Sequence, residues 1–205
     1  QNVMLPSNDV AARAALARAS ADYTNTGQDR GYTGSGVIIA VLDTGVDNEH
    51  RSLNDFDDVN DDPDLDPTSY SDQKWFAGFD ATATTPDESG ATDPDDNNGH
   101  GTHVAGSALG TGDSSRVHMG TGPGAGLVDV KVLSDAGGTN AQFTYRGLQW
   151  VFNNSETDWG VNSTYNGIQI ASMSYGSVGG GPLGSGTGDN GSSAEASLVN
   201  LLSLE

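Results

Sequence analysis

The pattern of apolar and polar residues along the chain predicts strands that alternate with helices. Residues 37–42 are six consecutive apolar residues without alternation, which is typical of a strand covered on both faces, as in parallel sheets. Further strands are predicted over residues 126–133 and 167–174, and helices over residues 9–20, 100–109, 139–154 and 193–202. Strands that alternate with helices at these lengths favour β-α-β crossovers. The pattern therefore predicts an α/β fold with a mainly parallel sheet.

One long stretch between these elements is dominated by charge. From Asp43 through Asp96 the chain carries 17 acidic residues and two basic ones, Arg51 and Lys74, with four prolines spaced through it. Prolines and clustered charges disfavour a packed interior. We expect this stretch to be loop rather than core.

Composition limits the classes of partner. The chain has 205 residues, 34% of them hydrophobic, which is enough for one domain or part of one. Its formal net charge of −20 would repel nucleic acid and anionic membranes, so we expect neither as a partner. The apolar runs are shorter than the about 18 residues that a membrane span requires. The sequence has no cysteine, which removes disulfides and thiolate metal sites and fits the secreted, extracellular protein that we expect.

Two residues stand where reactive groups gather in a parallel sheet. Asp43 directly follows the buried strand, at the carboxyl end where loops leave a crevice. A carboxylate there can orient a histidine and stabilise its imidazolium, and the alternative is an ordinary turn or capping aspartate. His100 opens a predicted helix between two glycines that leave its ring reachable, and a general base near neutral pH is normally a histidine.

His100 has alternative interpretations of its own. One is a solvated surface imidazole, and the other is a metal site shared with His103. The two histidines stand three residues apart with no third ligand nearby in the sequence, and the residues between them coordinate poorly, so the metal interpretation is disfavoured. We expect His103 to be buried and structural.

Three segments, in order along the chain, resemble the motifs of a known family. Residues 41–47, Val-Leu-Asp-Thr-Gly-Val-Asp, are similar to the aspartate motif of the subtilases, the subtilisin-like serine proteases. Residues 99–106, Gly-His-Gly-Thr-His-Val-Ala-Gly, resemble their histidine motif, and residues 171–176 resemble their substrate-binding strand. The resemblance covers about residues 31–205 and implies a subtilisin-like three-layer α/β fold with a mainly parallel sheet, incomplete in this chain.

The resemblance also implies roles for individual residues. Asp43 would be the orienting carboxylate and His100 the general base, and these are the candidate catalytic residues. One wall of the substrate cleft would be Ser174, Tyr175 and Gly176, the facing edge would be Gly137, Gly138 and Thr139, and the second subsite would be lined by Leu133. An extended peptide would add between the two edges as a strand. An ordinary glycine turn between strand and helix is the alternative for the facing edge.

One part of the family pattern is missing. No segment resembles the Gly-Thr-Ser-Met-Ala motif that carries the nucleophilic serine, or the asparagine that helps to stabilise the oxyanion. Residues 1–205 are therefore interpreted as the amino-terminal part of one subtilase catalytic domain, whose serine and asparagine come from a carboxyl-terminal segment. The expected function is a serine endopeptidase that acts on peptides or proteins and is inactive as an isolated chain. The alternatives are an engineered or evolved fragment without chemistry and a non-catalytic peptide- or calcium-binding module of the same fold.

Calcium binding is the second departure from the family. Ser52 stands where many subtilases have a calcium-binding aspartate. An acidic insertion at about residues 54–97 instead offers oxygen-bearing side chains at alternate positions, namely Asp58, Asn60, Asp62, Asp64 and Asp66. Hard cations prefer several carboxylate oxygens, so Ca²⁺ is the expected structural cofactor, and a plain solvated charge run is the alternative. Three more acids, Asp93, Asp95 and Asp96, precede His100. They would form either a second cation site or a solvated, acidic access to that residue.

Overall fold

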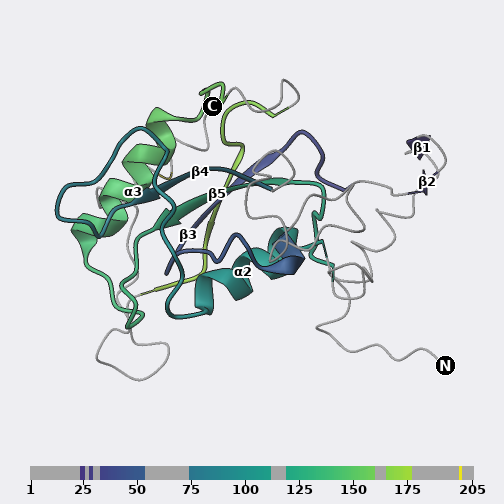
Figure 1. The fold of residues 1–205 in the computed structure, drawn as a ribbon. Coiled ribbons are helices and arrows are strands. Elements are labelled where there is room, and N and C mark those ends of the chain that lie inside the picture. The colour runs from purple at the N-terminus through teal and green to yellow at the C-terminus, as the bar shows by residue number, and fades with distance from the viewer. Residues whose placement is uncertain are drawn as a thin grey trace, which may run out of the picture.

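The structure, a computed structural model, describes residues 33–53, 74–111, 119–159 and 165–176, together with Val199 and the backbone of residues 24–25 and 28–29. Within these residues the main sheet has four strands in the order β4-β5-β3-β6, and each neighbouring pair is parallel (Figure 1). The strands are β3 (Ile38–Asp43), β4 (Trp75–Asp80), β5 (Gly126–Lys131) and β6 (Ile170–Met173). A separate antiparallel pair joins the two-residue strands β1 (Thr24–Asn25) and β2 (Gln28–Asp29).

Strand β3 lies inside the sheet and is buried along its whole length, as its unbroken apolar run predicts. On one face, Ile38, Ala40 and Leu42 join the core cluster beneath helix α3 (Ala141–Asn153). On the other face, Ile39 and Val41 join the cluster beneath helix α2 (His100–Leu109). The two helices cover opposite faces of the sheet (Figure 1), so the described residues form the three layers of the predicted α/β fold.

The two described helices begin close to the predicted positions for identifiable reasons. Helix α2 has the predicted bounds. Helix α3 is capped by Asn140, whose side chain accepts a hydrogen bond from Phe143 N at 3.0 Å. A Cβ added at Gly147 would lie 2.4 Å from Cγ1 of Val132, so the glycine lets α3 approach the sheet closely. A short 3-10 turn, η1 (Arg51–Leu53), follows the loop after β3.

Strand β4 corrects the expectation that residues 43–96 are loop throughout. Ala77 and Phe79 are each 1% exposed, and the Phe79 ring stacks on Trp150 of α3 with centroids 5.2 Å apart. The prediction was wrong here because the acidic residues on either side mask a short strand of six residues that ends in Asp80. The burial of its apolar side chains against α3 outweighs the charge of its surroundings.

The strands predicted over residues 126–133 and 167–174 are longer than the observed β5 and β6. The main-chain N–H groups of Val132 and Leu133 both donate to Asp43 O at 2.9 Å, so the regular β3–β5 ladder ends at the Asp43–Lys131 pair. The predicted helices over 9–20 and 193–202 lie outside the described residues, apart from Val199. So do the five predicted calcium ligands, Asp58, Asn60, Asp62, Asp64 and Asp66.

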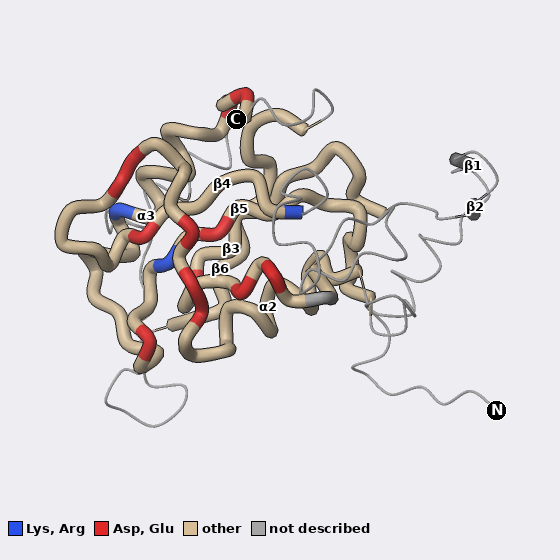
Figure 2. Tube along the Cα trace, in the orientation of Figure 1, with Lys and Arg blue, Asp and Glu red and all other residues tan. Residues whose placement is uncertain are grey.

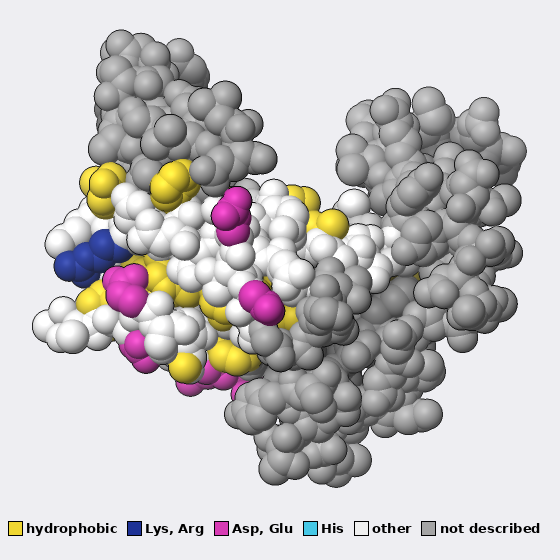
Figure 3. Space-filling model, turned by 90° about the horizontal axis from the view of Figure 1, so that it is seen from above, with side chains coloured by type: hydrophobic (Ala, Val, Ile, Leu, Met, Phe, Trp, Pro, Cys, Tyr) yellow, Lys and Arg dark blue, Asp and Glu magenta, His cyan; other side chains and the backbone are white. Residues whose placement is uncertain are grey.

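Acidic residues gather around the carboxyl ends of the strands. Asp43 and Asp80 end β3 and β4, and Asp135 follows β5, whereas few Lys or Arg residues appear in the described part of the chain (Figure 2). On the face shown in Figure 3, the visible acidic side chains are scattered among apolar and neutral groups. Among the described residues, no helix has the length and apolar character needed to cross a lipid bilayer.

Candidate active site

The end of β3 and the start of α2 bring Asp43 and His100 together. His100 Nδ1 lies 2.7 Å from Asp43 Oδ1, and the aspartate side chain is fully buried whereas 48% of the histidine side chain is exposed. Because an ionised carboxylate only accepts hydrogen bonds, Nδ1 donates and Nε2 is the acceptor nitrogen of the ring. Asp43 Oδ1 also accepts from Thr44 N at 2.8 Å. The Asp43 carboxylate therefore orients the His100 ring, and the ring can take up a proton at Nε2.

Gly101 lets α2 approach the loop after β3, and Gly45 lets the loop before α2 approach it. A Cβ at Gly101 would lie 2.0 Å from Gly45 O and 3.1 Å from Asp43 Cβ. Gly45 itself has a φ of +102°, and a Cβ there would lie 2.4 Å from Pro94 O. Gly99, on the other side of His100, has a φ of +93° and open space around its Cβ position. One glycine beside His100 thus allows close packing, and the other leaves the ring accessible.

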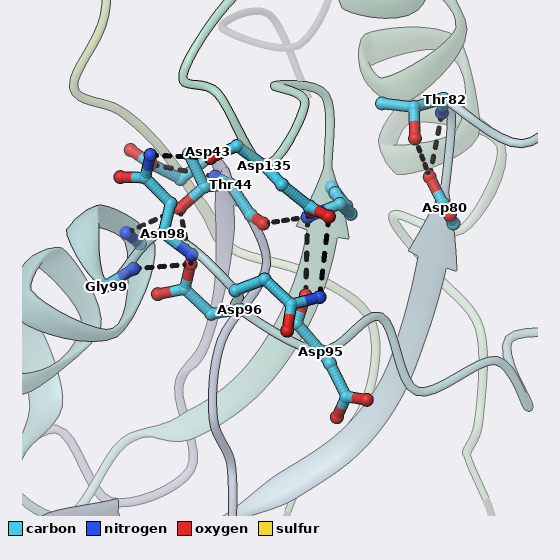
Figure 4. A network of polar contacts seen from close by, with 12 residues as sticks. Asp43, Thr44, Asp80, Thr82, Asp95, Asp96, Asn98, Gly99 and Asp135 are labelled. Carbon is cyan, nitrogen blue, oxygen red and sulfur yellow. Dashed lines mark hydrogen bonds and ion pairs between the residues drawn. The ribbon is translucent and has the colours of Figure 1, made fainter.

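The first turn of α2 is capped from outside the helix. Gly99, the N-cap residue, has no side chain to accept the free N–H groups. Instead Thr102 N donates to Asp96 Oδ2 and Gly101 N donates to Thr44 Oγ1, each at 2.9 Å. Figure 4 shows Asp96 and Thr44 beside this end of the helix. Partial burial opposes ionisation of Asp96, but hydrogen bonds from Thr102, Gly99 and Thr44 outweigh it and lower the pKa of this carboxyl to about 2.

A buried lysine supports the loop that follows Asp43. Lys131, the β5 residue paired with Asp43, is 6% exposed. Its ammonium group donates to Thr44 O and to Asp95 O, the latter at 3.3 Å, and forms an ion pair with Asp135 Oδ1 at 2.8 Å. Lys131 therefore joins the loop after β3, the loop before α2 and the turn after β5.

Asp129 is a second buried acid beneath the site, and sequence reasoning missed it. It is 0% exposed, and its Oδ2 accepts from Val46 N at 2.8 Å, while Oδ1 is buried without a hydrogen-bond partner among the described residues. Burial raises the pKa of Asp129 well above the ordinary value for aspartate, and the charge of Asp93 adds to this effect. The signal in the sequence was an acid at the centre of a predicted buried strand.

The predicted cleft residues follow the two strands that flank β3. Leu133 is buried, and Gly137, Gly138 and Thr139 are exposed on the turn after β5, where Ser134 N donates to Gly138 O at 2.8 Å. After β6, Ser174 and Gly176 are exposed, while Tyr175 is half-buried, and burial raises the pKa of its hydroxyl to about 12. Because β5 and β6 are parallel to β3 on either side, these residues follow the strands at the sheet edge that carries Asp43.

The structure corrects the expectation for His103, whose side chain is exposed rather than buried. His103 is the fourth residue of α2 and faces away from the sheet, because Ala105 and Leu109 are the residues that the helix buries in the core. It lines a cavity of about 780 Å³ with residues that include His50 and Met119. No group of three metal-ligating side chains that includes a histidine comes together among the described residues.

The described acids near His100 separate into two groups. Carboxylate oxygens of Glu49, Asp93 and Asp95 lie within 4.8 Å of one another and are positioned to share a cation. Partial burial and the charge of Glu49 raise the pKa of Asp93 to about 6. Asp96 does not belong to this group, since its oxygens accept hydrogen bonds from Thr44 and α2.

Comparison with known proteins assigns the family. The profile of the Subtilase family matches residues 34–203, so the chain belongs to the subtilase family. It is 33% identical over 153 residues to alkaline elastase YaB of Bacillus sp. strain YaB, covering 75% of this chain and 30% of that protein. It is 34% identical over 149 residues to subtilisin Savinase of Lederbergia lenta, covering 73% of this chain and 40% of that protein. It is also 32% identical over 126 residues to subtilisin E of Bacillus subtilis strain 168, covering 62% of this chain and 26% of that protein.

A solved structure, that of sphericase, matches with 32% identity and a TM-score of 0.47, covering 69% of this chain and 38% of that chain. The chain thus spans less than half the length of each of these relatives. The described sheet, helices and family match together establish the subtilisin-like α/β fold and the relationship to subtilase proteases.

Proposed function

We propose that this chain provides the aspartate and histidine of a subtilisin-type serine endopeptidase, which hydrolyses peptide bonds through an acyl-enzyme. The observation that carries the proposal is the 2.7 Å contact between the buried Asp43 carboxylate and the half-exposed ring of His100. Membership of the subtilase family supports it. In this proposal the nucleophilic serine and an oxyanion-binding asparagine come from a carboxyl-terminal segment of the same protease, and these 205 residues alone are inactive.

The chemistry follows from the orientation of the ring. Because Nδ1 of His100 donates to Asp43, Nε2 is free to take the proton from a serine hydroxyl as its oxygen attacks the substrate carbonyl. The Asp43 carboxylate stabilises the imidazolium that forms. The ring then returns the proton to the leaving amine, and a water molecule repeats the sequence on the acyl-enzyme to release the acid and restore the serine.

The proposed cleft lies between the residues that follow β5 and β6. An extended peptide would add there as a strand, with Gly137, Gly138 and Thr139 on one side and Ser174, Tyr175 and Gly176 on the other. The exposure of all of these except Tyr175 supports this placement. Leu133 would form the floor of the second subsite.

A structural Ca²⁺ ion and an extracellular location belong to the same proposal. The ligands would be Asp58, Asn60, Asp62, Asp64 and Asp66, which lie outside the described residues. The support is the alternation of these oxygen-bearing side chains in a chain whose formal net charge is −20. The absence of cysteine and the strong acidity fit a secreted protein.

Replacing His100 by Ala tests the proposal in the assembled protein, meaning this chain together with the segment that carries the serine. Removing the triad histidine from subtilisin, a member of the same family, costs a factor of about 10⁴ or more in kcat, and we expect a loss of that order here. His103→Ala is the matched control, because His103 is an exposed residue of the same helix. Its kcat on a peptide amide should stay within about twofold of the natural protein.

Labelling with a fluorophosphonate separates the enzyme from a non-catalytic binding module. The assembled protein should be labelled on serine, and His100→Ala should be labelled far more slowly because the hydroxyl has lost its base. Near-normal peptide cleavage by His100→Ala would show that His100 is not the general base. A natural protein that neither cleaves peptides nor reacts with the reagent would remove the enzyme proposal altogether.

A further inference from the structure

The Asp96 carboxylate is bonded on one side to the loop after β3 and on the other to the start of α2. Its Oδ1 accepts from Thr44 Oγ1 at 2.8 Å, from Gly99 N at 2.9 Å and from Asn98 N at 3.0 Å. Its Oδ2 accepts from Thr102 N at 2.9 Å and Thr102 Oγ1 at 2.6 Å. Both oxygens are therefore engaged, which excludes the solvated-approach interpretation of this residue. Figure 4 shows Asp96 between Thr44 and Gly99.

Thr44 completes a closed link around the candidate catalytic pair. It directly follows Asp43 and is 1% exposed. Its hydroxyl donates to Asp96 and accepts from Gly101 N at 2.9 Å. The residues on both sides of His100, Gly99 and Gly101, are thus joined through Asp96 and Thr44 to the main chain beside Asp43.

This link supports a helix start whose N-cap residue has no capping side chain of its own. Two other contacts reach the same turn, from Asn98 Nδ2 to Asp135 O at 2.8 Å and from Asp47 N to Thr102 Oγ1 at 3.0 Å. Gly99 has no side chain and nothing within 4 Å of its Cβ position, and 48% of the His100 side chain is exposed. A helix N-terminus favours a negative charge, and hydrogen bonds to an ionised group are stronger than neutral ones. A carboxylate at position 96 therefore suits both partners, whereas an amide would present donors to groups that themselves donate.

We propose that Asp96 is a positioning residue that holds the Asp43 carboxylate and the His100 ring in the geometry required for proton transfer. It acts through Thr44 and the first turn of α2 and touches neither the ring nor the substrate cleft. The proposal rests on the proposed endopeptidase function. It differs from that function in predicting a defined hydrogen bond between Asp43 and His100 that weakens when Asp96 is changed, whether or not a peptide is cleaved.

The first test is kinetic and uses the assembled protein. Asp96→Asn keeps the shape of the side chain but replaces one acceptor oxygen by a donor, so we expect kcat on a peptide amide to fall by about 10- to 100-fold, with KM changed less than about twofold. Thr44→Val, which removes the bridging hydroxyl, should lower kcat in the same way. Thr44→Ser keeps the hydroxyl and should retain most of the natural kcat. Asp87→Asn is the matched control, since Asp87 is an exposed acid whose hydrogen-bond partner among the described residues is Ser89 in its own loop.

The second test observes the hydrogen bond directly. In the natural protein, the proton between His100 Nδ1 and Asp43 should give a far-downfield resonance in the proton NMR spectrum. We expect it to move upfield or broaden in Asp96→Asn and Thr44→Val, and to stay in place in Thr44→Ser and Asp87→Asn. His100→Ala assigns the resonance by removing it.

The outcomes are distinct. A kcat within twofold of normal and an unmoved resonance in Asp96→Asn would overturn the positioning role. If that variant does not fold, the same result in Thr44→Val would overturn it. A natural protein without proteolytic activity would refute the proposed function, and the resonance comparison would still decide whether Asp96 holds the pair together.

Discussion

At the scale of single residues, the site is built from acids in very different surroundings. Asp43 is buried and bonded to His100, Asp96 is saturated with hydrogen bonds, and Asp129 is buried with one oxygen lacking a partner among the described residues. Hydrogen bonds to the ionised form hold the pKa of Asp96 at about 2, whereas burial raises the pKa of Asp129 well above its ordinary value. Residue type alone does not determine which acid is charged at a given pH.

Replacing Asp129 by Asn should change how stability depends on pH. The folded pKa of Asp129 is raised, so the unfolded chain loses this proton first as pH rises above 3.8, the ordinary pKa of an aspartate. The free energy of unfolding of the natural protein should therefore fall as pH rises from that value through the folded pKa. The asparagine side chain cannot ionise, so Asp129→Asn should show a flatter curve in urea unfolding measured across this range.

Asp87→Asn is the control for this measurement. Hydrogen bonds from Ser89 lower the pKa of the exposed Asp87 carboxyl. Its substitution should alter the curve only at the acidic end, where a lowered carboxyl pKa contributes stability that is lost as pH falls. Parallel curves for the natural protein and Asp129→Asn would mean that Asp129 ionises as readily when folded as when unfolded.

At the scale of elements, Gly101 controls how closely α2 lies against the end of β3. A Cβ at this position would come within 2.0 Å of Gly45 O, so Gly101→Ala must displace the helix start or the loop. Displacement by about 1 Å can cost about 10²-fold in rate, and we expect a loss of that order in kcat of the assembled protein. Alanine favours helix over glycine by about 1 kcal/mol, so a weaker helix would not explain the loss.

Gly106→Ala provides the matched control within α2. Its Cβ position has nothing within 4 Å, so this variant should keep normal kcat and gain about 0.5–1 kcal/mol in the free energy of unfolding. If Gly101→Ala behaved in the same way, the close approach of α2 to β3 would have no part in activity.

The elements that the sequence predicts well are those with a strong local pattern. The apolar run of β3 and the glycine-flanked start of α2 each identify an element, and with them the positions of Asp43 and His100. Strand β4 was missed because a glycine interrupts its apolar residues and acidic segments lie on both sides. His103 was misplaced because its exposure depends on which face of α2 packs on the sheet.

The supporting contacts could not be predicted because they join distant parts of the chain. Thr44 and Asp96 are 52 residues apart, and Val46 and Asp129 are 83 residues apart. Nothing local in the sequence distinguishes Asp96 from Asp93 and Asp95, and only the folded arrangement assigns it to the helix start. Sequence motifs therefore locate the candidate catalytic pair, while the fold reveals what holds that pair in place.

At the scale of the whole molecule, the net charge of −20 makes cations important for stability. NaCl should raise the thermal midpoint gradually by screening repulsion between carboxylates. If the acidic insertion binds Ca²⁺, CaCl₂ at matched ionic strength should raise the midpoint further and at lower concentration, because binding to the folded state adds its own stabilisation. A chelator should reverse only this second effect, as measured by calorimetry.

The variant that isolates the proposed calcium ligands is Asp62→Asn combined with Asp64→Asn. It should lose the Ca²⁺-specific increase and keep the response to NaCl. Asp87→Asn removes an acid outside the proposed site and should keep both responses. Equal midpoints in NaCl and CaCl₂ at the same ionic strength would identify the insertion as an ordinary solvated charge run.

Strand β6 is the outer strand of the described sheet on the side away from β4, and it has a consequence for handling the protein. Ile170 and Met173 on this strand are 48% and 37% exposed. A strand edge with apolar side chains is a template on which another strand can add. Concentrated preparations of this chain alone are therefore expected to self-associate, and dilution or an added charged residue on β6 is the practical remedy.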